Sequence, residues 1–241
     1  MAPINSTPLQ NEFIQAVKHG DLDKLKYLLQ KGVNIDASFE QSRGNAIAYA
    51  VEHKHHKVIE WLITQGADIN SITTDRQFTP LHRAVLTENI NIAKLLINSG
   101  SKIDIGDSKE WTALYWAVAI RNEQLVKLLL SAGADPYLTT NIGLNALTTA
   151  AIEGSVSTIN IFLSKGYDIN QRDRNGHTMI SAAVNAGHYS IVEMLIERGA
   201  DIYLQYRHEG SLLDIANKFG HEELSALLIS EGVKSLQADK P

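Results

Sequence analysis

The chain has 241 residues, of which 44% are hydrophobic and 20% charged, the composition of an ordinary folded, water-soluble protein. Its 22 Lys and Arg against 27 Asp and Glu leave a net charge of −5, which argues against generic nucleic-acid binding because that depends on neutralising phosphates. The chain has no cysteine, so disulfides, thiolate zinc sites and a cysteine nucleophile are excluded.

The N-terminal residues 1–8 have neither a basic region nor an apolar stretch, so we expect a flexible N-terminus without a Sec signal peptide. No apolar run along the chain approaches the roughly 20 residues that a membrane-spanning helix needs. We therefore expect a cytoplasmic protein that does not engage a membrane. Secretion as an effector through another signal would not be visible in the sequence.

A glycine returns every 33 or 34 residues along the rest of the chain, each time after a run rich in leucine or isoleucine. The copies are Gly32, Gly66, Gly100, Gly133, Gly166, Gly199 and Gly232. A fixed period of this length predicts a stacked array of repeats rather than one globular core.

The third repeat shows the expected elements most clearly. Thr79 is a good N-cap and Pro80 suits the first helical position, so a helix is predicted to begin there. After a short turn, apolar residues at helical spacing predict a second helix over residues 90–97. Gly100 ends this helix, because the left-handed conformation just past a helix is easiest for glycine. The unit is therefore helix, turn, helix and an extended polar loop.

These units resemble the ankyrin repeat, whose consensus carries T-P-L-H-x-A in the first helix, G-H between the helices and L-L-x-x-G-A-D after the second. The matching segments are Thr79-Pro80-Leu81-His82, Gly187-His188, Gly220-His221, Gly66-Ala67-Asp68, Gly133-Ala134-Asp135 and Gly199-Ala200-Asp201. The resemblance covers about residues 9–233. It implies an all-α ankyrin-repeat solenoid of helix-turn-helix units with projecting hairpin loops.

We expect a single ankyrin-repeat domain over residues 9–233, between the flexible N-terminus and a flexible C-terminal tail over 234–241. Its seven repeats are expected at about 9–41, 42–75, 76–109, 110–142, 143–175, 176–208 and 209–233. The first and last units depart from the pattern, as repeats that cap an array do.

Histidines offer the chain's main candidate for metal chemistry. His53, His55 and His56 cluster at a turn between two helices. However, His55 holds the histidine position of the ankyrin turn, and neighbouring lysines would repel a cation, so a structural role is favoured over a metal site. The resemblance likewise implies a structural role for His82 of the T-P-L-H motif.

The resemblance further implies that the loop tips and the exposed side of the first helices line a concave groove that binds partner proteins. Phe78, Trp111 and Leu144 occupy equivalent positions there, and stacking is expected to align them as one exposed apolar ridge. The other candidate residues are Tyr49, Leu86, Tyr115, Trp116 and Ile120 beside the ridge, and Asp75, Arg76, Arg83 and Lys109 at its charged rim. An aromatic centre with a polar rim is typical of a protein-binding hot spot. The alternative is that Trp111 and Trp116 pack against a neighbouring repeat.

No motif for catalysis accompanies these repeats: the sequence has no nucleophile elbow, H-E-x-x-H pair, Walker-type loop or Rossmann glycine fingerprint. We therefore expect a non-catalytic protein–protein interaction module with no cofactor and no bound metal, monomeric when free. It would act on its partner as an inhibitor, adaptor or effector. Two alternatives stay open, a structural scaffold that self-associates through the ridge and a His-based metal-binding or catalytic protein.

Overall fold

The chain is helical in the computed structural model, which describes residues 8–36, 44–206 and 209–236. These described residues form 14 helices, and their only β feature is an isolated bridge between Tyr206 and Gly210. The predicted all-α fold is therefore confirmed. Of the two ends expected to be flexible, residues 1–7 and 237–241 lie outside the described part.

The chain divides into two compact units, residues 1–117 with 128–134 and residues 118–127 with 135–241. The first unit contains α1 (Pro8–His19), α2 (Leu22–Gln30), α3 (Ala46–Glu52), α4 (His56–Thr64), α5 (Pro80–Leu86) and α6 (Ile90–Asn98). The second contains α9 (Ala146–Ile152), α10 (Val156–Ser164), α11 (Met179–Ala186), α12 (Tyr189–Glu197), α13 (Leu212–Lys218) and α14 (Glu222–Ser230). Helices α7 (Ala113–Ala119) and α8 (Glu123–Ser131) each contribute residues to both units.

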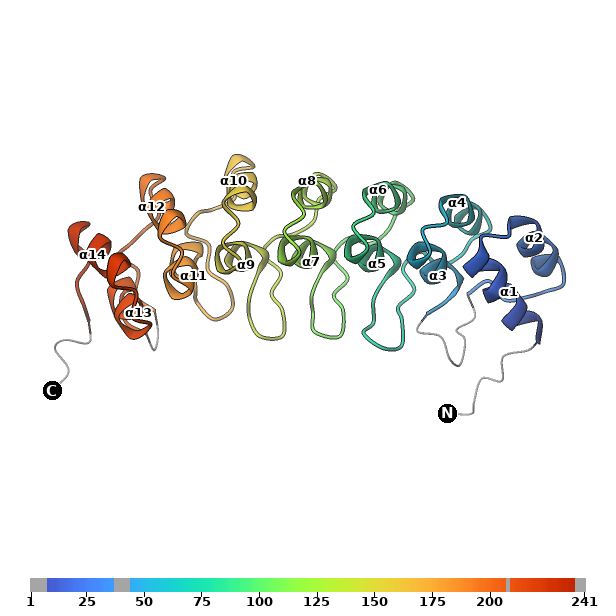
Figure 1. The fold of residues 1–241 in the computed structure, drawn as a ribbon, viewed down its shortest axis with the longest axis horizontal. Coiled ribbons are helices and arrows are strands. Elements are labelled where there is room, and N and C mark those ends of the chain that lie inside the picture. Colours follow the sequence, from blue (N-terminus) through green and yellow to red (C-terminus); the bar gives the residue numbers. More distant parts are fainter. Residues whose placement is uncertain (1–7, 37–43, 207–208, 237–241) are drawn as a thin grey trace. The chain divides into compact units, whose positions relative to one another are not determined.

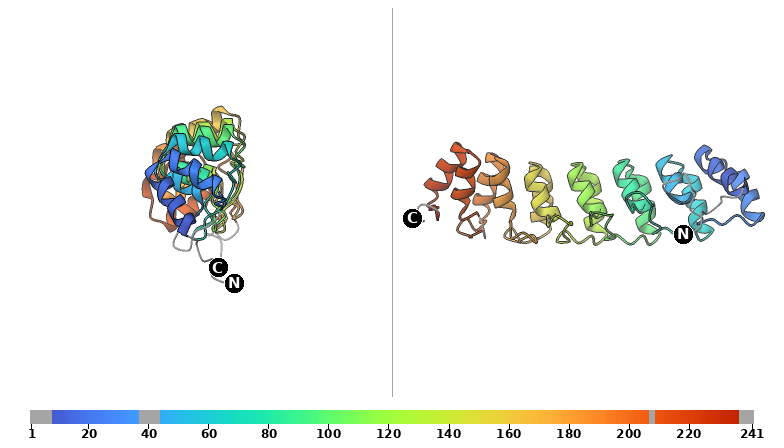
Figure 2. Two further views of the ribbon diagram at one scale, coloured as in Figure 1. Left: turned by 90° about the vertical axis from the view of Figure 1, so that its right-hand side faces the viewer. Right: turned by 90° about the horizontal axis from the view of Figure 1, so that it is seen from below.

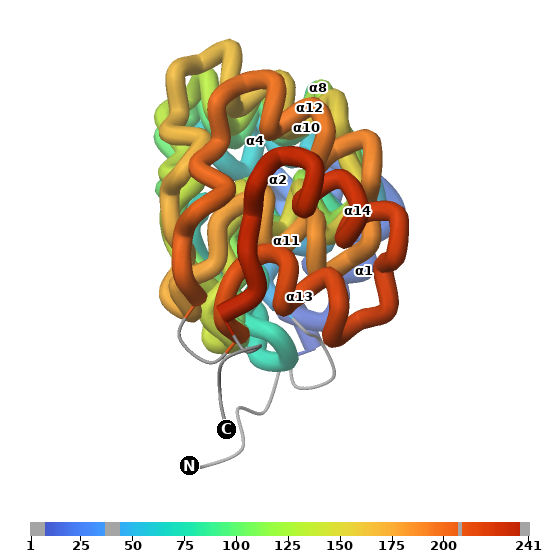
Figure 3. Tube along the Cα trace, turned by 90° about the vertical axis from the view of Figure 1, so that its left-hand side faces the viewer, coloured from blue at the N-terminus to red at the C-terminus, as the bar shows by residue number. Residues whose placement is uncertain are grey.

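Within each unit, successive helix pairs lie side by side (Figures 1 and 2). Helix α3 contacts α1 and α5 in the first unit, and α11 contacts α9 and α13 in the second. Figure 3 shows the second unit from its C-terminal end, with α13 and α14 in front of α11 and α12. The core lies between neighbouring pairs, where side chains such as Leu62, Leu81 and Phe162 are fully buried. Each pair thus buries its apolar face against the next, as in other repeat proteins.

The first helix of a pair begins at a side chain that satisfies free backbone N–H groups. Thr79 Oγ1 accepts the N–H of His82, and the His82 ring accepts the N–H of Thr79, which together form a capping box. Asn145, Thr178 and Ser211 begin α9, α11 and α13 in the same way. Such caps each stabilise a helix by about 1 kcal/mol, and here they also fix where the preceding loop must end.

In three repeats, a histidine in the turn between the two helices bonds to the repeat before it. Nε2–H of His188 donates to the carbonyl of Ile152 at 2.8 Å, and Nε2–H of His221 donates to that of Asn185 at 3.1 Å. The ring of His221 lies against Gly187, where an added Cβ would come within 2.8 Å of it. Glycine stands there because the position combines a φ of 76° with no room for a side chain.

His55, one of the three clustered histidines, makes the same kind of bond. Its Nε2–H donates to the carbonyl of Lys18 at 2.8 Å, and its ring stacks on that of His53 with centroids 6.1 Å apart. Nδ1 of His56 instead faces Glu60 at 3.4 Å. The contacts of His55 therefore agree with the structural role favoured for it, because its ring joins the second repeat to the first.

Two residues of the tail predicted to be flexible over 234–241 contact α13. The Ser235 hydroxyl and the Leu236 N–H both donate to the carboxylate of Asp214, the latter at 2.9 Å. Burial opposes ionisation of Asp214, but these bonds and those from Ser211 outweigh it and lower the pKa of Asp214. The last repeat is thus covered in part by the segment that follows it.

Candidate partner-binding site

The hairpin before α7 is closed by the side chain of Asp107. Its Oδ1 accepts the N–H groups of Lys109 at 2.8 Å and Trp111 at 3.0 Å, while the Asp107 N–H donates to the carbonyl of Trp111 at 3.0 Å. Asp favours such turns because its short side chain can bond to backbone two or more residues ahead. The turn therefore holds Trp111 at the point where the hairpin enters α7.

Five ring side chains of the first unit gather beside this hairpin, and we call them the aromatic cluster. Its members are Phe78, His82, Trp111, Tyr115 and Trp116. The Trp111 ring lies 4.7 Å from both Tyr115 and Trp116, and Trp116 meets Phe78 edge-on at 5.9 Å between centroids. Tilted and edge-to-face contacts at these distances are favourable beyond the area they bury.

The predicted exposed ridge is wrong in part. Phe78 is only 7% exposed, packed against the rings of Trp116 and His82, and Tyr115 is likewise 7% exposed. Trp111 and Trp116 remain half-buried. Leu144 belongs to the second unit. The physical reason is that Trp116 folds across onto Phe78 instead of standing behind it, since burying both rings is more favourable than leaving them in water.

His82 connects α5 to the aromatic cluster through the backbone of Trp111. Its Nε2–H donates to the Trp111 carbonyl at 2.9 Å, while Nδ1 accepts the N–H of Thr79 at 3.2 Å. These partners require the neutral ring, and burial lowers the pKa of His82 accordingly. The structural role expected for His82 thus includes the positioning of Trp111, which the motif alone does not reveal.

The two indoles differ in how their N–H groups are satisfied. Nε1–H of Trp116 donates to Oδ2 of Asp107 at 3.2 Å. Nε1–H of Trp111 is buried and has no hydrogen-bond partner among the described residues. A buried donor left without a partner costs about 1–3 kcal/mol, so Trp111 is held in place by packing in spite of that penalty.

Two cations lie over rings of the aromatic cluster. The Lys109 ammonium lies 5.4 Å from the Trp111 ring centre, and the Arg76 guanidinium lies 5.9 Å from that of Phe78. Both side chains are exposed, where a cation–π contact contributes about 0.5–1 kcal/mol. Two predicted rim residues therefore do border the cluster.

The remaining rim residues, Asp75 and Arg83, are tied to neighbouring side chains. Arg83 donates from its guanidinium to Oε2 of Glu52 at 3.0 Å. Burial opposes ionisation of Asp75, but bonds from the Thr73 hydroxyl and the Arg76 N–H and the charge of Arg83 outweigh it, so the pKa of Asp75 is lowered. The rim is therefore charged at neutral pH with both signs interspersed.

Three other candidate residues, Tyr49, Leu86 and Ile120, are half-buried and lie outside the aromatic cluster. The ring of Tyr49 on α3 carries the Lys18 ammonium at 4.9 Å. Leu86 ends α5, and Ile120 belongs to the second unit. The structure thus brings together Phe78, Trp111, Tyr115 and Trp116, and it does not add these three to the same set of ring contacts.

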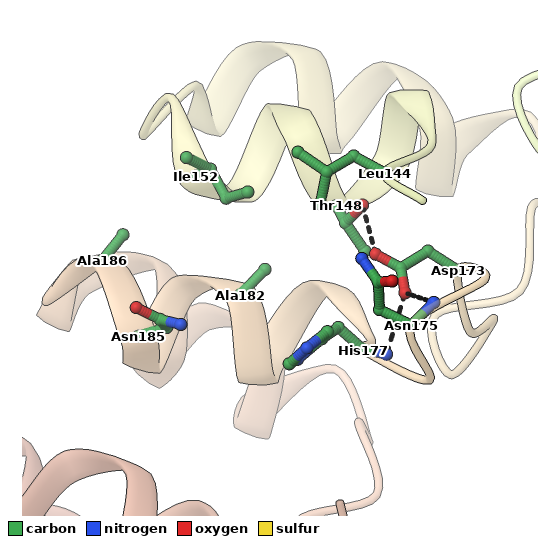
Figure 4. A pocket seen from close by; sticks show the side chains of 9 residues that line it. All are labelled: Leu144, Thr148, Ile152, Asp173, Asn175, His177, Ala182, Asn185 and Ala186. Carbon is green, nitrogen blue, oxygen red and sulfur yellow. Dashed lines mark hydrogen bonds between the residues drawn. The ribbon is translucent and has the colours of Figure 1, made fainter. Parts of the chain in front are cut away.

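A cavity of about 280 Å³ opens in the second unit between α9, α11 and the hairpin before α11 (Figure 4). Its walls are Leu144, Thr148, Ile152, Asp173, Asn175, His177, Ala182, Asn185 and Ala186. Burial raises the pKa of Asp173, although hydrogen bonds to its carboxylate oppose this. Of the lining residues, only Leu144 was a candidate from the sequence. The available signal was the pair of small residues, Ala182 and Ala186, on one helix face.

Two searches of the described residues bear on other functions. No group of three or more His, Cys, Asp or Glu side chains is placed there to hold a metal ion. No helix in this part of the chain is long and apolar enough to cross a membrane.

Pairs of short helices joined by projecting loops, which lie side by side within each unit, define a helical repeat protein. The family model described as ankyrin repeats (3 copies) matches residues 10–73, 71–140, 114–206 and 147–239. The chain therefore belongs to the ankyrin-repeat family, as its motifs predicted.

Relatives and a solved structure agree with this assignment. The chain is 30% identical over 100 residues to an ankyrin repeat protein of Rickettsia felis, a match covering 41% of this chain and 44% of that protein. It is 32% identical over 93 residues to the ankyrin repeat protein FPV244 of fowlpox virus, covering 39% of this chain and 14% of the viral protein. The crystal structure of the ankyrin repeat domain of Bcl-3, a member of the IkappaB protein family, matches with a TM-score of 0.71 and 26% identity over 78% of this chain and 86% of that one. The matched segments thus span less than half of the two relatives.

Ankyrin repeats generally serve as protein–protein interaction modules, and the family and fold are typically non-catalytic.

Proposed function

We propose that the chain binds a partner protein through the half-buried indoles of Trp111 and Trp116, and that it acts without catalysis by occupying that partner as an inhibitor, an adaptor or an effector. The observation that carries the proposal is the anchoring of these two rings. Trp116 is bonded to Asp107, and the backbone of Trp111 is bonded to Asp107 and His82. Tryptophan is enriched among interface hot spots, and rings already held in place lose little entropy on binding.

The charged rim supports the same surface. Arg76 lies over the ring of Phe78 and Lys109 over that of Trp111, and Asp75 adds a carboxylate beside them. In this arrangement the indoles would supply most of the affinity, while the rim would set the association rate and the choice of partner. The net charge of −5 and the lack of a membrane-capable helix in the described residues also fit a protein partner in the cytoplasm.

The test is capture of the partner from the native cell, followed by mass spectrometry, with wild-type protein and matched variants. Trp111→Ala with Trp116→Ala should reduce partner affinity by at least about 2 kcal/mol, roughly thirtyfold, because hot-spot truncations reach this size. Tyr203→Ala is the control, since Tyr203 is 67% exposed and lies in the second unit. Lys109→Glu changes the rim without removing a ring and should weaken capture as well.

Circular dichroism decides whether each variant remains folded. A folded double tryptophan variant that captures the same protein as the wild type would contradict the proposal. The competing idea of a self-associating scaffold predicts oligomers in size-exclusion chromatography with light scattering. We expect a monomer at every concentration, and a dimer that Trp111→Ala with Trp116→Ala dissolves would favour the scaffold instead.

A further inference from the structure

Two repeats share an aspartate that begins the hairpin and differ at the position nine residues later. Asp107 is followed in this register by Trp116, and Asp173 is followed by Ala182. Asp173 closes its hairpin as Asp107 does: its Oδ1 accepts the N–H groups of Asn175 at 2.9 Å and His177 at 3.0 Å. The same loop geometry is therefore present in both repeats, with an indole beside it in only one.

Trp116 shows what fills this position when a large side chain is present. Its ring lies against Phe78 of the preceding repeat and Trp111 of its own, and its N–H donates to Oδ2 of Asp107. The residues in the corresponding register around Ala182 are Leu144 and His177. Both line the 280 Å³ cavity, together with Ala182 and Asp173 (Figure 4). The cavity thus occupies the place that an indole takes in the other repeat.

The carboxylate of Asp173 keeps an acceptor site on the side of the cavity. Among the described residues, the one hydrogen bond to its Oδ2 comes from the Thr148 hydroxyl at 3.2 Å, and the single proton of that hydroxyl can also go to Asn145. A carboxylate oxygen has lone pairs for a second bond. Apolar wall atoms come from Leu144, Ile152 and the two alanines of α11. The site therefore combines apolar wall atoms with a charged acceptor, which suits a ring that carries one N–H.

We propose that this cavity binds a tryptophan side chain of a partner polypeptide, with the indole between Leu144 and His177 and its N–H donating to Oδ2 of Asp173. The bound ring reproduces the contacts that Trp116 makes within the chain. Phenylalanine would leave the acceptor unused. This site lies in the second unit, so its test is independent of the test of the aromatic cluster in the first unit. The experiment uses defined probes instead of the unknown partner.

The decisive measurement is a nuclear magnetic resonance titration of the full chain with N-acetyl-tryptophanamide, observing signals of Thr148, Ala182 and Ala186. One side chain without its polypeptide binds weakly, so saturation is expected at about millimolar concentration. The matched probe is the blocked 3-benzothienylalanine amide, in which sulfur replaces the N–H. It should bind about tenfold more weakly, because a hydrogen bond to a charged acceptor is lost.

Two variants locate the effect. Ala182→Trp fills the cavity with the chain's own indole and should abolish the shifts while raising the melting temperature. Asp173→Asn keeps an oxygen for the hairpin N–H groups but replaces the Oδ2 acceptor by an amide donor, and the Thr148 hydroxyl can then donate to the Asn145 carbonyl. The tenfold preference for the indole over the benzothienyl probe should then disappear.

Several results would overturn the proposal. These are the absence of saturable shifts in the wild type, equal binding of the two probes, and undiminished binding by a folded Ala182→Trp variant. Binding of free tryptophan without binding of the blocked amide would also overturn it, because the site would then serve a metabolite. The comparison of the two probes uses the wild type alone, so it decides the matter even if a variant fails to fold.

Discussion

The two indoles of the aromatic cluster provide a direct test of how the cluster is held together. Trp111→Phe and Trp116→Phe each shorten the ring and remove one N–H. They differ in what that N–H does: Trp116 donates to Asp107 at 3.2 Å, whereas the buried N–H of Trp111 has no partner among the described residues. The two substitutions should therefore have different effects on the free energy of unfolding.

Trp116→Phe loses a hydrogen bond to a carboxylate, which contributes about 1.5–3 kcal/mol, and leaves Oδ2 of the buried Asp107 without that donor. Trp111→Phe removes a donor whose burial without a partner costs about 1–3 kcal/mol, and this gain offsets a loss of roughly 1 kcal/mol from the smaller ring. The same loss of roughly 1 kcal/mol for the smaller ring applies at position 116. We therefore expect Trp116→Phe to destabilise the protein by about 3 kcal/mol and Trp111→Phe to be close to neutral.

Urea unfolding followed by far-ultraviolet circular dichroism measures both changes. Because repeat proteins can unfold in parts, the slope with urea must be the same for the wild type and both variants before midpoints are compared. Equal destabilisation by the two substitutions would refute the reasoning, since it would mean that ring size alone matters at both positions. A larger loss for Trp111→Phe would refute it as well.

Three further predictions concern other parts of the chain. Burial lowers the pKa of His82 below its ordinary 6.5, so the unfolded state binds more protons below that pH and stability falls with falling pH, by at most about 1.4 kcal/mol per pH unit. The variant His82→Ser should lose this part of the slope when urea midpoints are compared between pH 5 and 7; an unchanged slope would contradict it. Gly187→Ala should be more destabilising than Gly220→Ala by about 1 kcal/mol. The two positions have similar φ values, 76° and 72°, so the backbone cost is the same, but only at Gly187 does the new methyl group meet the ring of His221. Equal shifts in melting temperature would argue against this contact. Trp116→Ala opens a vacancy of the kind seen in the second unit, and millimolar indole should restore part of its lost melting temperature while leaving the wild type unaffected.

The repeat architecture could be predicted from the sequence because its signals are local and recur. A glycine after each second helix and a cap such as Thr79 before a first helix each report the backbone of a few residues, and the period then places them in register. The seven glycines that recur from Gly32 to Gly232 all have positive φ in the structure, from 82° to 92°. The structural role of His82 followed from the same motif.

The aromatic surface could be predicted only in part, because burial depends on how side chains meet across repeats. Sequence register puts Phe78 and Trp111 at equivalent positions, but it does not show that Trp116 lies across Phe78. One rotamer choice of a tryptophan decides which ring is exposed. That choice depends on Asp107, whose carboxylate draws the Trp116 indole toward the hairpin. Position in the repeat therefore identified the neighbourhood of the candidate site, while the exposed rings depend on a hydrogen bond that no motif marks.

The hydrogen bond between Trp116 and Asp107 also helps to interpret the cavity of the second unit. Ala182 on its own is an ordinary small residue on a helix face, and Asp173 on its own is an ordinary turn residue. Comparison with Asp107 and Trp116 shows that the carboxylate of such a turn can also act as the acceptor for an indole. Asp173 provides the same kind of acceptor, but the position of the indole is taken by the small side chain of Ala182. One repeat of such a protein can therefore be used to interpret another. Where one repeat fills a position with a large side chain and a second repeat has a cavity and the same acceptor there, the side chain of the first repeat is the chemical group to test as a ligand of the second.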